Sequence, residues 1–461
     1  MFKVAVSPTL QHWRSLTIGF LASLLLSSCA ASPPEETPAA TNVTVIEGAR
    51  VIIGDGSPPI ENATLILEDD QFIHVGAGNE SEVPAGSVHV DLTGRTIMPA
   101  IIDTHVHLSP TRTALIEDLQ RKAYYGVSAV LALGRGVSAD SFQIRAETVP
   151  NAARYLTAGR GITAPEPGRT EVPYWITSED EARSAVQELA EQDVDFVKIW
   201  VDDRNGQFDK LSPEIYSAVI DEAHKHELRV TAHIFALEDA KQLLRAGVDA
   251  FAHGVRDQDI DDEFVELVKE RPHVVLVPNL GNRGIEEDLS WLSKTIPPTE
   301  LLELQESYTD RPEVEERFNI QARNLARLNA EGMRIAFGTD GGAGWSPHLE
   351  MADMVASGMT PHEVIVAATQ NSAELLELND LGTIAVGNSA DFIVLETNPL
   401  DDITNMSSNP FKKWSVKASP TSPLTTIWWN SKLRKRPLKW PPAQAPTNRG
   451  AKKVWLNKPA R

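Results

Sequence analysis

Residues 99–107 read PAIIDTHVH, an apolar run that ends in two histidines separated by one residue. A short apolar run of this kind is typical of a buried strand. Alternate residues of an extended chain point to the same side, so His105 and His107 can hold one ion together. Imidazole is a suitable ligand for zinc and similar ions. We therefore expect a metal centre at the end of this strand.

Strand-like runs alternate with helical stretches along the middle of the chain. They lie at 97–102, 128–133, 154–157, 196–200, 229–232, 250–252, 274–277 and 334–337. Ser212 and Pro213 predict one helix start, and Gly247 predicts the end of a helix at 237–246. Eight strands alternating with helices favour a closed parallel barrel. An open doubly wound sheet is the alternative, but no Gly-rich phosphate loop follows an early strand.

Short β-branched runs punctuated by turn residues occur before and after this region. They lie at 43–46, 50–53, 63–67, 72–75 and 88–92, and again at 390–395 and 425–429. We predict an α/β fold: a distorted (β/α)8 TIM barrel over 99–380, with a small β-sandwich domain formed from both chain ends. That domain would comprise 43–98 and 381–435.

Further metal-capable side chains fall at predicted strand ends, where barrel active sites are built. His233, His253 and Asp340 end the fifth, sixth and eighth strands, and Lys198 lies in the apolar fourth strand. A buried lysine tends to become neutral, and a neutral amine can react with carbon dioxide to form an anionic carbamate. The alternative is a lysine at the barrel rim whose ammonium reaches water. The residues alone leave both open.

Several motifs together resemble those of the amidohydrolase superfamily, with Ala100 where glycine is usual. They are PAIIDTHVH at 99–107, TAH at 231–233, FAHG at 251–254, FGTD at 337–340, LGTI at 381–384 and GNSADF at 387–392. The similarity spans roughly residues 43–403. It is closest to the subgroup of prolidase-like dipeptidases and N-acyl amino acid hydrolases, which carry a lysine on strand four.

This resemblance implies a binuclear centre with two divalent ions, expected to be Zn²⁺. His105, His107 and Asp340 would hold one ion, His233 and His253 the other, and Lys198, carboxylated by carbon dioxide, would bridge them. The implied reaction is cleavage of a C–N amide or peptide bond in a dipeptide, an N-acyl amino acid or a similar amide. A metal-bridging hydroxide would attack, with Asp340 as general acid and base.

Two other functions compete with this one. A mononuclear deaminase or ring-opening hydrolase on the same fold usually has Glu three residues after the strand-five histidine, where this chain has Ala236. The second competing function is that of a surface protein that keeps the fold only for binding. The complete set of candidate ligands argues against it. His348, in the loop after strand eight, is a candidate substrate-binding residue.

The charge of the chain limits its partners. The net charge of -21 argues against nucleic acid as a partner, because phosphate binding requires a basic surface. Residues 411–461 nevertheless hold 13 Lys and Arg and no Asp or Glu. We interpret 405–423 as an insertion and 436–461 as a solvated basic tail. A small-molecule amide or peptide is the expected partner, and the oligomeric state stays open.

The first residues resemble a bacterial lipoprotein signal peptide. A basic start and an apolar core at 16–26 precede Leu-Ser-Ser-Cys, in which Cys29 is the only cysteine of the chain. We predict a signal peptide at 1–28, lipidation of Cys29 and a Pro/Ala/Thr-rich tether at 29–42. The protein would then be lipid-anchored to a membrane in the bacterial cell envelope, facing the periplasm or the exterior. An ordinary cleaved signal is the alternative.

Overall fold

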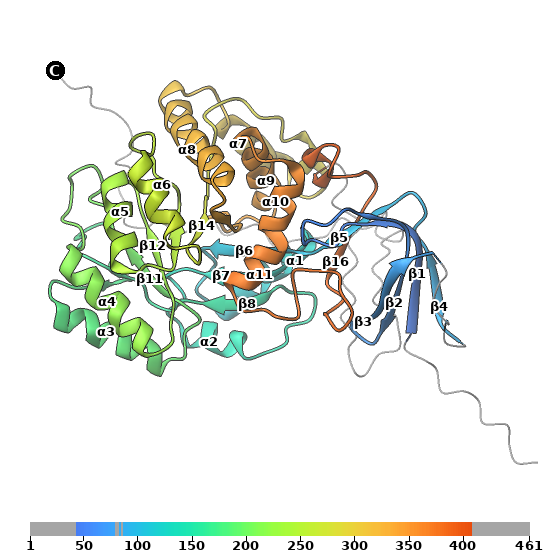
Figure 1. Ribbon diagram of the computed structural model, residues 1–461, viewed down its shortest axis with the longest axis horizontal. Helices are drawn as coiled ribbons and strands as arrows, with labels where there is room; N and C mark the ends of the chain where they lie inside the picture. Colours follow the sequence, from blue (N-terminus) through green and yellow to red (C-terminus); the bar gives the residue numbers. More distant parts are fainter. Residues whose placement is uncertain (1–42, 79–82, 84–85, 408–461) are drawn as a thin grey trace, which may run out of the picture. The chain divides into compact units, whose positions relative to one another are not determined.

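The computed structural model describes residues 43–78, 83 and 86–407 (Figure 1). Its strands are β1 Val43–Val51, β2 Ile60–Glu68, β3 Gln71–Ala77, β4 Val88–Asp91, β5 Thr96–Pro99, β6 Ile101–Val106, β7 Val127–Ala132, β8 Arg154–Thr157, β9 Ile162–Thr163, β10 Tyr174–Trp175, β11 Val197–Trp200, β12 Val230–His233, β13 Ala250–Ala252, β14 Val275–Val277, β15 Arg334–Ile335 and β16 Phe392–Leu395. Its helices are α1 Arg112–Tyr124, α2 Ala139–Arg145, α3 Glu179–Glu191, α4 Pro213–Lys225, α5 Leu237–Ala246, α6 Asp262–Lys269, η1 Ser290–Lys294, α7 Pro298–Ser307, α8 Pro312–Ala330, α9 Ser346–Ala356, α10 Pro361–Val366, η2 Ala367–Asn371, α11 Ser372–Leu375 and η3 Ile403–Met406.

Strands from both ends of the described chain form one six-stranded sheet. Its order is β16-β5-β1-β2-β3, and β4 pairs with β1. The two runs expected at 43–46 and 50–53 are a single strand, β1, because Gly48 takes a φ of +84° and the pairing with β2 shifts register after Glu47. The described residues show one sheet here rather than the two stacked sheets of a sandwich. The strand expected at 425–429 lies outside them, and the domain limits stay a prediction.

The remaining strands are parallel and build a TIM-barrel-like α/β arrangement. They form a seven-stranded sheet, β10-β9-β11-β12-β13-β14-β15, and a three-stranded sheet, β6-β7-β8. Backbone hydrogen bonds join these sheets at two places. The amide of Thr104 in β6 donates to Phe337 O beyond β15 (2.9 Å), and the amide of Asp195 before β11 donates to Thr157 O in β8 (2.9 Å). The eight expected strands correspond to β6, β7, β8 and β11 to β15.

The first expected barrel strand, at 97–102, is in fact divided between two sheets. β5 pairs with β16 through Pro99, whereas β6 starts at Ile101 and pairs with β7. His105 therefore lies inside β6 rather than after it, and His107 follows directly. The two-residue strands β9 and β10 carry too short a pattern to be recognised in the sequence.

Helices cover the outer side of the parallel strands, as Figure 1 shows for α3, α4 and α5 beside β11 and β12. Their apolar faces, including Leu189, Ile220 and Leu243, join one large core cluster with the strands. Burying each such side chain contributes about 1.5–3 kcal/mol. α5 ends before Gly247, which is left-handed (φ +93°) as predicted, whereas the Ser212 hydroxyl does not cap α4.

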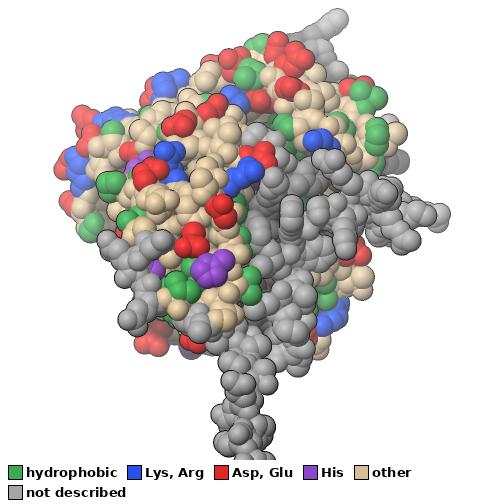
Figure 2. Space-filling model, turned by 90° about the vertical axis from the view of Figure 1, so that its right-hand side faces the viewer, with side chains coloured by type: hydrophobic (Ala, Val, Ile, Leu, Met, Phe, Trp, Pro, Cys, Tyr) green, Lys and Arg blue, Asp and Glu red, His purple; other side chains and the backbone are tan. Residues whose placement is uncertain are grey.

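Several sequence-based expectations fall outside the described residues. These are the signal peptide, the lipidation of Cys29, the tether, the basic tail and most of the insertion. Within the described residues, no helix is long and apolar enough to cross a membrane. On the described part of the face in Figure 2, basic, acidic and apolar side chains lie interspersed.

Candidate metal centre

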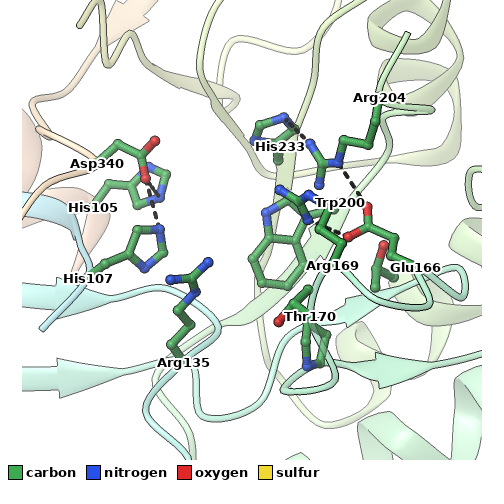
Figure 3. A pocket seen from close by; sticks show the side chains of 12 residues that line it. His105, His107, Arg135, Glu166, Arg169, Thr170, Trp200, Arg204, His233 and Asp340 are labelled. Atoms are coloured by element: carbon green, nitrogen blue, oxygen red, sulfur yellow. Dashed lines mark hydrogen bonds and ion pairs between the residues drawn. The ribbon is translucent and has the colours of Figure 1, made fainter. Parts of the chain in front are cut away.

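The strand ends bring four of the expected ligands together. His105 lies in β6 and His107 follows it, His253 follows β13, and Asp340 follows the chain that extends from β15. Parallel strands end at the same edge of a sheet, so their carboxyl ends present these side chains to one site. Figure 3 shows Asp340 facing the rings of His105 and His107.

Short distances between Asp340 and three histidines define the site. Asp340 Oδ1 lies 3.1 Å from His105 Nε2 and 2.8 Å from His107 Nε2, and Oδ2 lies 3.5 Å from His253 Nε2. One ligand atom from each of His105, His253 and Asp340 lies within 4.8 Å of the other two. These spacings suit side chains that share an ion, because metal–nitrogen and metal–oxygen bonds measure about 2.0–2.2 Å.

Two of these residues have an unusual backbone. His253 and Asp340 take φ values of +74° and +52°, a region that non-glycine residues seldom occupy. Backbone hydrogen bonds hold both: His253 N donates to Val277 O (2.9 Å) and Asp340 N donates to His105 O (2.8 Å). Such conformations cost about 1–3 kcal/mol each and persist where the surroundings fix them, commonly at functional sites.

The pKa shifts favour the forms that bind metals. Burial lowers the pKa of His253 well below its ordinary value, with Arg256 adding to the effect. Burial also lowers the pKa of His107, although the hydrogen bond with Asp340 opposes it. Burial raises the pKa of Asp340, but the charge and hydrogen bond of His105 outweigh it and hold the pKa well below its usual range. His107 and His253 are thus favoured in the neutral form and Asp340 in the ionised form, and these are the forms that ligate divalent ions.

Lys198 is completely buried in β11. The residue is 0% exposed, which excludes the alternative of a rim lysine that reaches water. Its Nζ is a buried atom without a hydrogen-bond partner. Burial lowers the pKa of Lys198 to about 7. A buried amine without a hydrogen-bond partner is energetically unfavourable. Lys198 therefore fits a lysine that would be carboxylated and would then bind metal ions.

His233 is oriented differently from the other histidines. Its ring lies 4.6 Å from that of His253 between centroids, but its Nε2 lies 3.0 Å from Asp202 Oδ2. Guanidinium nitrogens of Arg204 and Arg256 lie 3.2 and 3.3 Å from the same Nε2. The structure thus places His233 beside the cluster, with its ligand atom turned to an Asp–Arg pair that the sequence analysis did not identify.

Residues behind the ligands fix their orientation. Asn279 Oδ1 accepts a hydrogen bond from His105 Nδ1 (2.9 Å), which leaves Nε2 for an ion. Asp103 accepts hydrogen bonds from Lys122 Nζ (2.8 Å) and from the Thr339 hydroxyl (2.8 Å). Thr339 precedes Asp340, so this buried network ties the first and last barrel strands together.

A cavity of about 180 Å³ opens in front of the cluster. Its lining residues are His105, His107, Arg135, Thr163, Glu166, Arg169, Thr170, Pro173, Trp200, Arg204, His233 and Asp340. His348, the expected substrate residue, is not among them. It is 3% exposed, its Nε2 lies 3.0 Å from Tyr125 O, and its ring packs against Trp291. The structure therefore places His348 in a core rather than at the cavity.

The sequence that builds this site matches a known family. The sequence profile of the amidohydrolase family matches residues 96–418. The chain belongs to the amidohydrolase family. Ochratoxinase of Aspergillus niger is 26% identical to it, over 86% of this chain and 87% of that enzyme. An uncharacterized protein of Mycobacterium tuberculosis is 27% identical, over 70% of this chain and 85% of that protein.

Solved structures agree on the fold of this amidohydrolase. A putative prolidase from Bifidobacterium longum has a TM-score of 0.69 at 25% identity, covering 84% of this chain and 96% of the prolidase. The family and the relatives identify the chain as a hydrolase acting on carbon–nitrogen bonds. Members of its superfamily generally use divalent metals, and His105, His253 and Asp340 form a cluster suited to one.

Proposed function

We propose that this amidohydrolase cleaves the amide or peptide bond of a small molecule at a binuclear metal centre. The observation that carries the proposal is the convergence of His105, His107, His253 and Asp340 beside a fully buried Lys198. The names of its relatives, a prolidase and an ochratoxinase, support amide bonds as the target.

The residues divide between two ions, expected to be zinc. His105, His107 and Asp340 would hold the first, and His253 with His233 the second, once His233 Nε2 exchanges Asp202 for the ion. Lys198 would join them as a carbamate. Its neutral Nζ would add to carbon dioxide: an N–C bond forms, the π pair of one C=O bond moves to oxygen, and one N–H proton leaves. The fully buried, partnerless Nζ supports this modification.

When bound, divalent ions would lower the pKa of a bound water and act as a Lewis acid for the scissile carbonyl. Asp340 then acts as the proton carrier: a carboxylate oxygen takes the proton of the attacking water and returns it to the leaving nitrogen. Asn279 keeps the Nδ1 proton of His105 in place, so that this imidazole stays in one tautomer.

Asp340→Asn tests this role directly. We expect turnover to fall by about 10²- to 10⁴-fold, because the amide cannot accept the proton, while metal content falls much less. Steady-state rates on a panel of dipeptides and N-acyl amino acids, with metal analysis of the same samples, give the result. Asp180→Asn, on an exposed position at the start of α3, is the matched control. Undiminished turnover of Asp340→Asn would exclude the role.

A mononuclear deaminase or ring-opening hydrolase is the second candidate. Such an enzyme usually has a proton-shuttling Glu at the position that Ala236 occupies in this chain. Ala236 is the N-cap residue of α5. Release of ammonia from ring substrates by protein holding one ion per chain would favour it. No hydrolysis of any substrate by metal-loaded protein would favour a protein that only binds.

We propose further that Cys29 is lipidated and anchors the protein in a bacterial cell envelope. This rests on the sequence pattern around the only cysteine. Cys29→Ser should move the protein from the membrane fraction to the soluble fraction of cells that express it. An unchanged distribution would contradict the anchor.

A further inference from the structure

The cavity of the metal centre contains three arginines, and two of them are paired with carboxylates. Arg169 and Arg204 both bind Glu166, the latter through Nε at 2.8 Å. Arg204 Nη1 also donates to Asp202 (2.5 Å). Glu166 is 1% exposed, so this wall of the cavity consists of ion pairs whose charges largely cancel.

Arg135 is the third arginine, and it is unpaired. In the part of the chain that the structure describes, no carboxylate lies within ion-pair distance of its guanidinium. Figure 3 shows this side chain extending into the cavity between His107 and Trp200. The cavity therefore presents one uncompensated cation next to the metal-ligating histidines, in a chain whose net charge is -21.

The backbone that carries Arg135 is closely packed on both sides. A Cβ on Gly134 would lie 2.3 Å from Trp200 Cη2, and one on Gly136 would lie 2.2 Å from Thr157 Oγ1. Gly134 O also accepts a hydrogen bond from Gly161 N (3.2 Å). Only glycines fit at these contacts. The loop after β7 thus holds the start of the Arg135 side chain in a defined place, which lowers the entropic cost of binding a ligand there.

We propose that Arg135 is a specificity-determining residue that binds a carboxylate of the substrate. A guanidinium pairs with a carboxylate through two parallel hydrogen bonds, and these are among the stronger polar contacts. The preferred substrates would be amides of amino acids that keep a free carboxylate, such as N-acyl amino acids and dipeptides. The inference rests on the proposed amide hydrolysis and assigns recognition of the substrate carboxylate to one residue of the cavity.

The test compares acids with their neutral counterparts. The zinc-loaded full chain and its Arg135→Met variant are assayed on a panel of N-acetyl amino acids and on the same compounds as C-terminal amides. We expect Arg135→Met to lower kcat/KM for the acids by roughly 10- to 150-fold, mainly by raising KM. For the amides, kcat/KM should change by less than about threefold. Arg135→Lys should recover part of the loss. Arg112→Met, which removes a surface arginine paired with Glu147, is the control.

The outcomes separate this inference from the proposed function. Equal losses on acids and amides, or a wild-type protein without preference for acids, would overturn the role of Arg135 and leave amide hydrolysis standing. If the wild type hydrolyses neither series, the proposed function fails. The role of Arg135 is then tested by calorimetric binding of the same acids and amides. Selective binding of the acids that Arg135→Met abolishes would support the role, and equal binding of acids and amides would refute it.

Discussion

Asn279 occupies a left-handed backbone position (φ +47°) and is buried, two features that suit an asparagine held in place for one contact. That contact is the hydrogen bond that its Oδ1 accepts from His105 Nδ1. A histidine that ligates a metal depends on such a partner for its tautomer and its orientation.

Replacing Asn279 by alanine should therefore weaken metal binding by about 10- to 100-fold. Competition with a chromophoric chelator measures the affinity. Asn279→Asp keeps an acceptor for His105 Nδ1 and should retain much of the affinity. The positioning role is wrong if both variants bind metal like the wild type, or if both lose it equally.

At the residue scale, the sequence identified the candidate ligands but not the residues that surround them. Histidines at strand ends are visible because the strand pattern and the residue type coincide, as at His253. Asn279 could be seen only as a polar loop residue near a strand end, since its partner is 174 positions away in the chain. Nothing in the sequence indicated Arg135. Its proposed role depends on the pairing of the other cavity arginines with carboxylates, which only the folded chain shows. His348 shows the converse, a polar residue near the site that packs inward.

At the element scale, a buried ion pair connects α1 with β6. Lys122 and Asp103 are both 0% exposed, and Asp103 also accepts hydrogen bonds from the amide and hydroxyl of Thr339. The pair thereby fixes the chain that carries Asp340 against the strand that carries His105. Removing one partner leaves an uncompensated charge in the core.

We expect Lys122→Met to lower the free energy of unfolding by about 3–5 kcal/mol, as measured by urea denaturation. Lys225→Met, in an exposed pair with Asp221, should change it by less than about 1 kcal/mol. The double variant Lys122→Met/Asp103→Asn, which has no isolated charge, should recover part of the loss. Equal effects of Lys122→Met and Lys225→Met would contradict this account.

The order of elements followed from the alternation of strand and helix patterns, but their pairing did not. The run at 97–102 changes sheets at Ala100, where the amide donates to Asp391 O (3.0 Å), a contact between distant parts of the sequence. Similarly, Gly48 allows one bulged strand where the local pattern indicated two. Periodicity identifies a strand, whereas its neighbours depend on packing that short sequence windows do not contain.

At the scale of the whole molecule, two buried acids of α9 couple stability to pH. Burial raises the pKa of Asp353 to about 8, with Arg283 opposing the shift and Glu287 adding to it. Burial also raises the pKa of Glu350, whose carboxylate accepts from Leu280 N (2.9 Å). Between the ordinary pKa of 3.8 and about 8, the folded chain retains a proton at Asp353 that the unfolded chain has lost.

The free energy of unfolding should therefore decrease as the pH rises through this window. Asp353→Asn removes the titrating group. The free energy of unfolding should then fall less steeply with pH, by a slope equivalent to at most one bound proton. Urea denaturation of the wild type and the variant from pH 5 to pH 8 measures both slopes. Parallel curves would show that Asp353 titrates alike in the folded and unfolded chains.

The central claim, a binuclear hydrolytic centre built around Lys198, is tested most directly by counting metal ions. Zinc-loaded wild-type protein and Lys198→Met are desalted and analysed for metal per chain, and the hydrolysis of N-acyl amino acids is measured on the same samples. We predict two ions per wild-type chain, and a variant that retains about one ion and loses turnover. A wild-type chain that is fully active with a single ion, or a Lys198→Met variant that keeps both ions and full activity, would contradict the account.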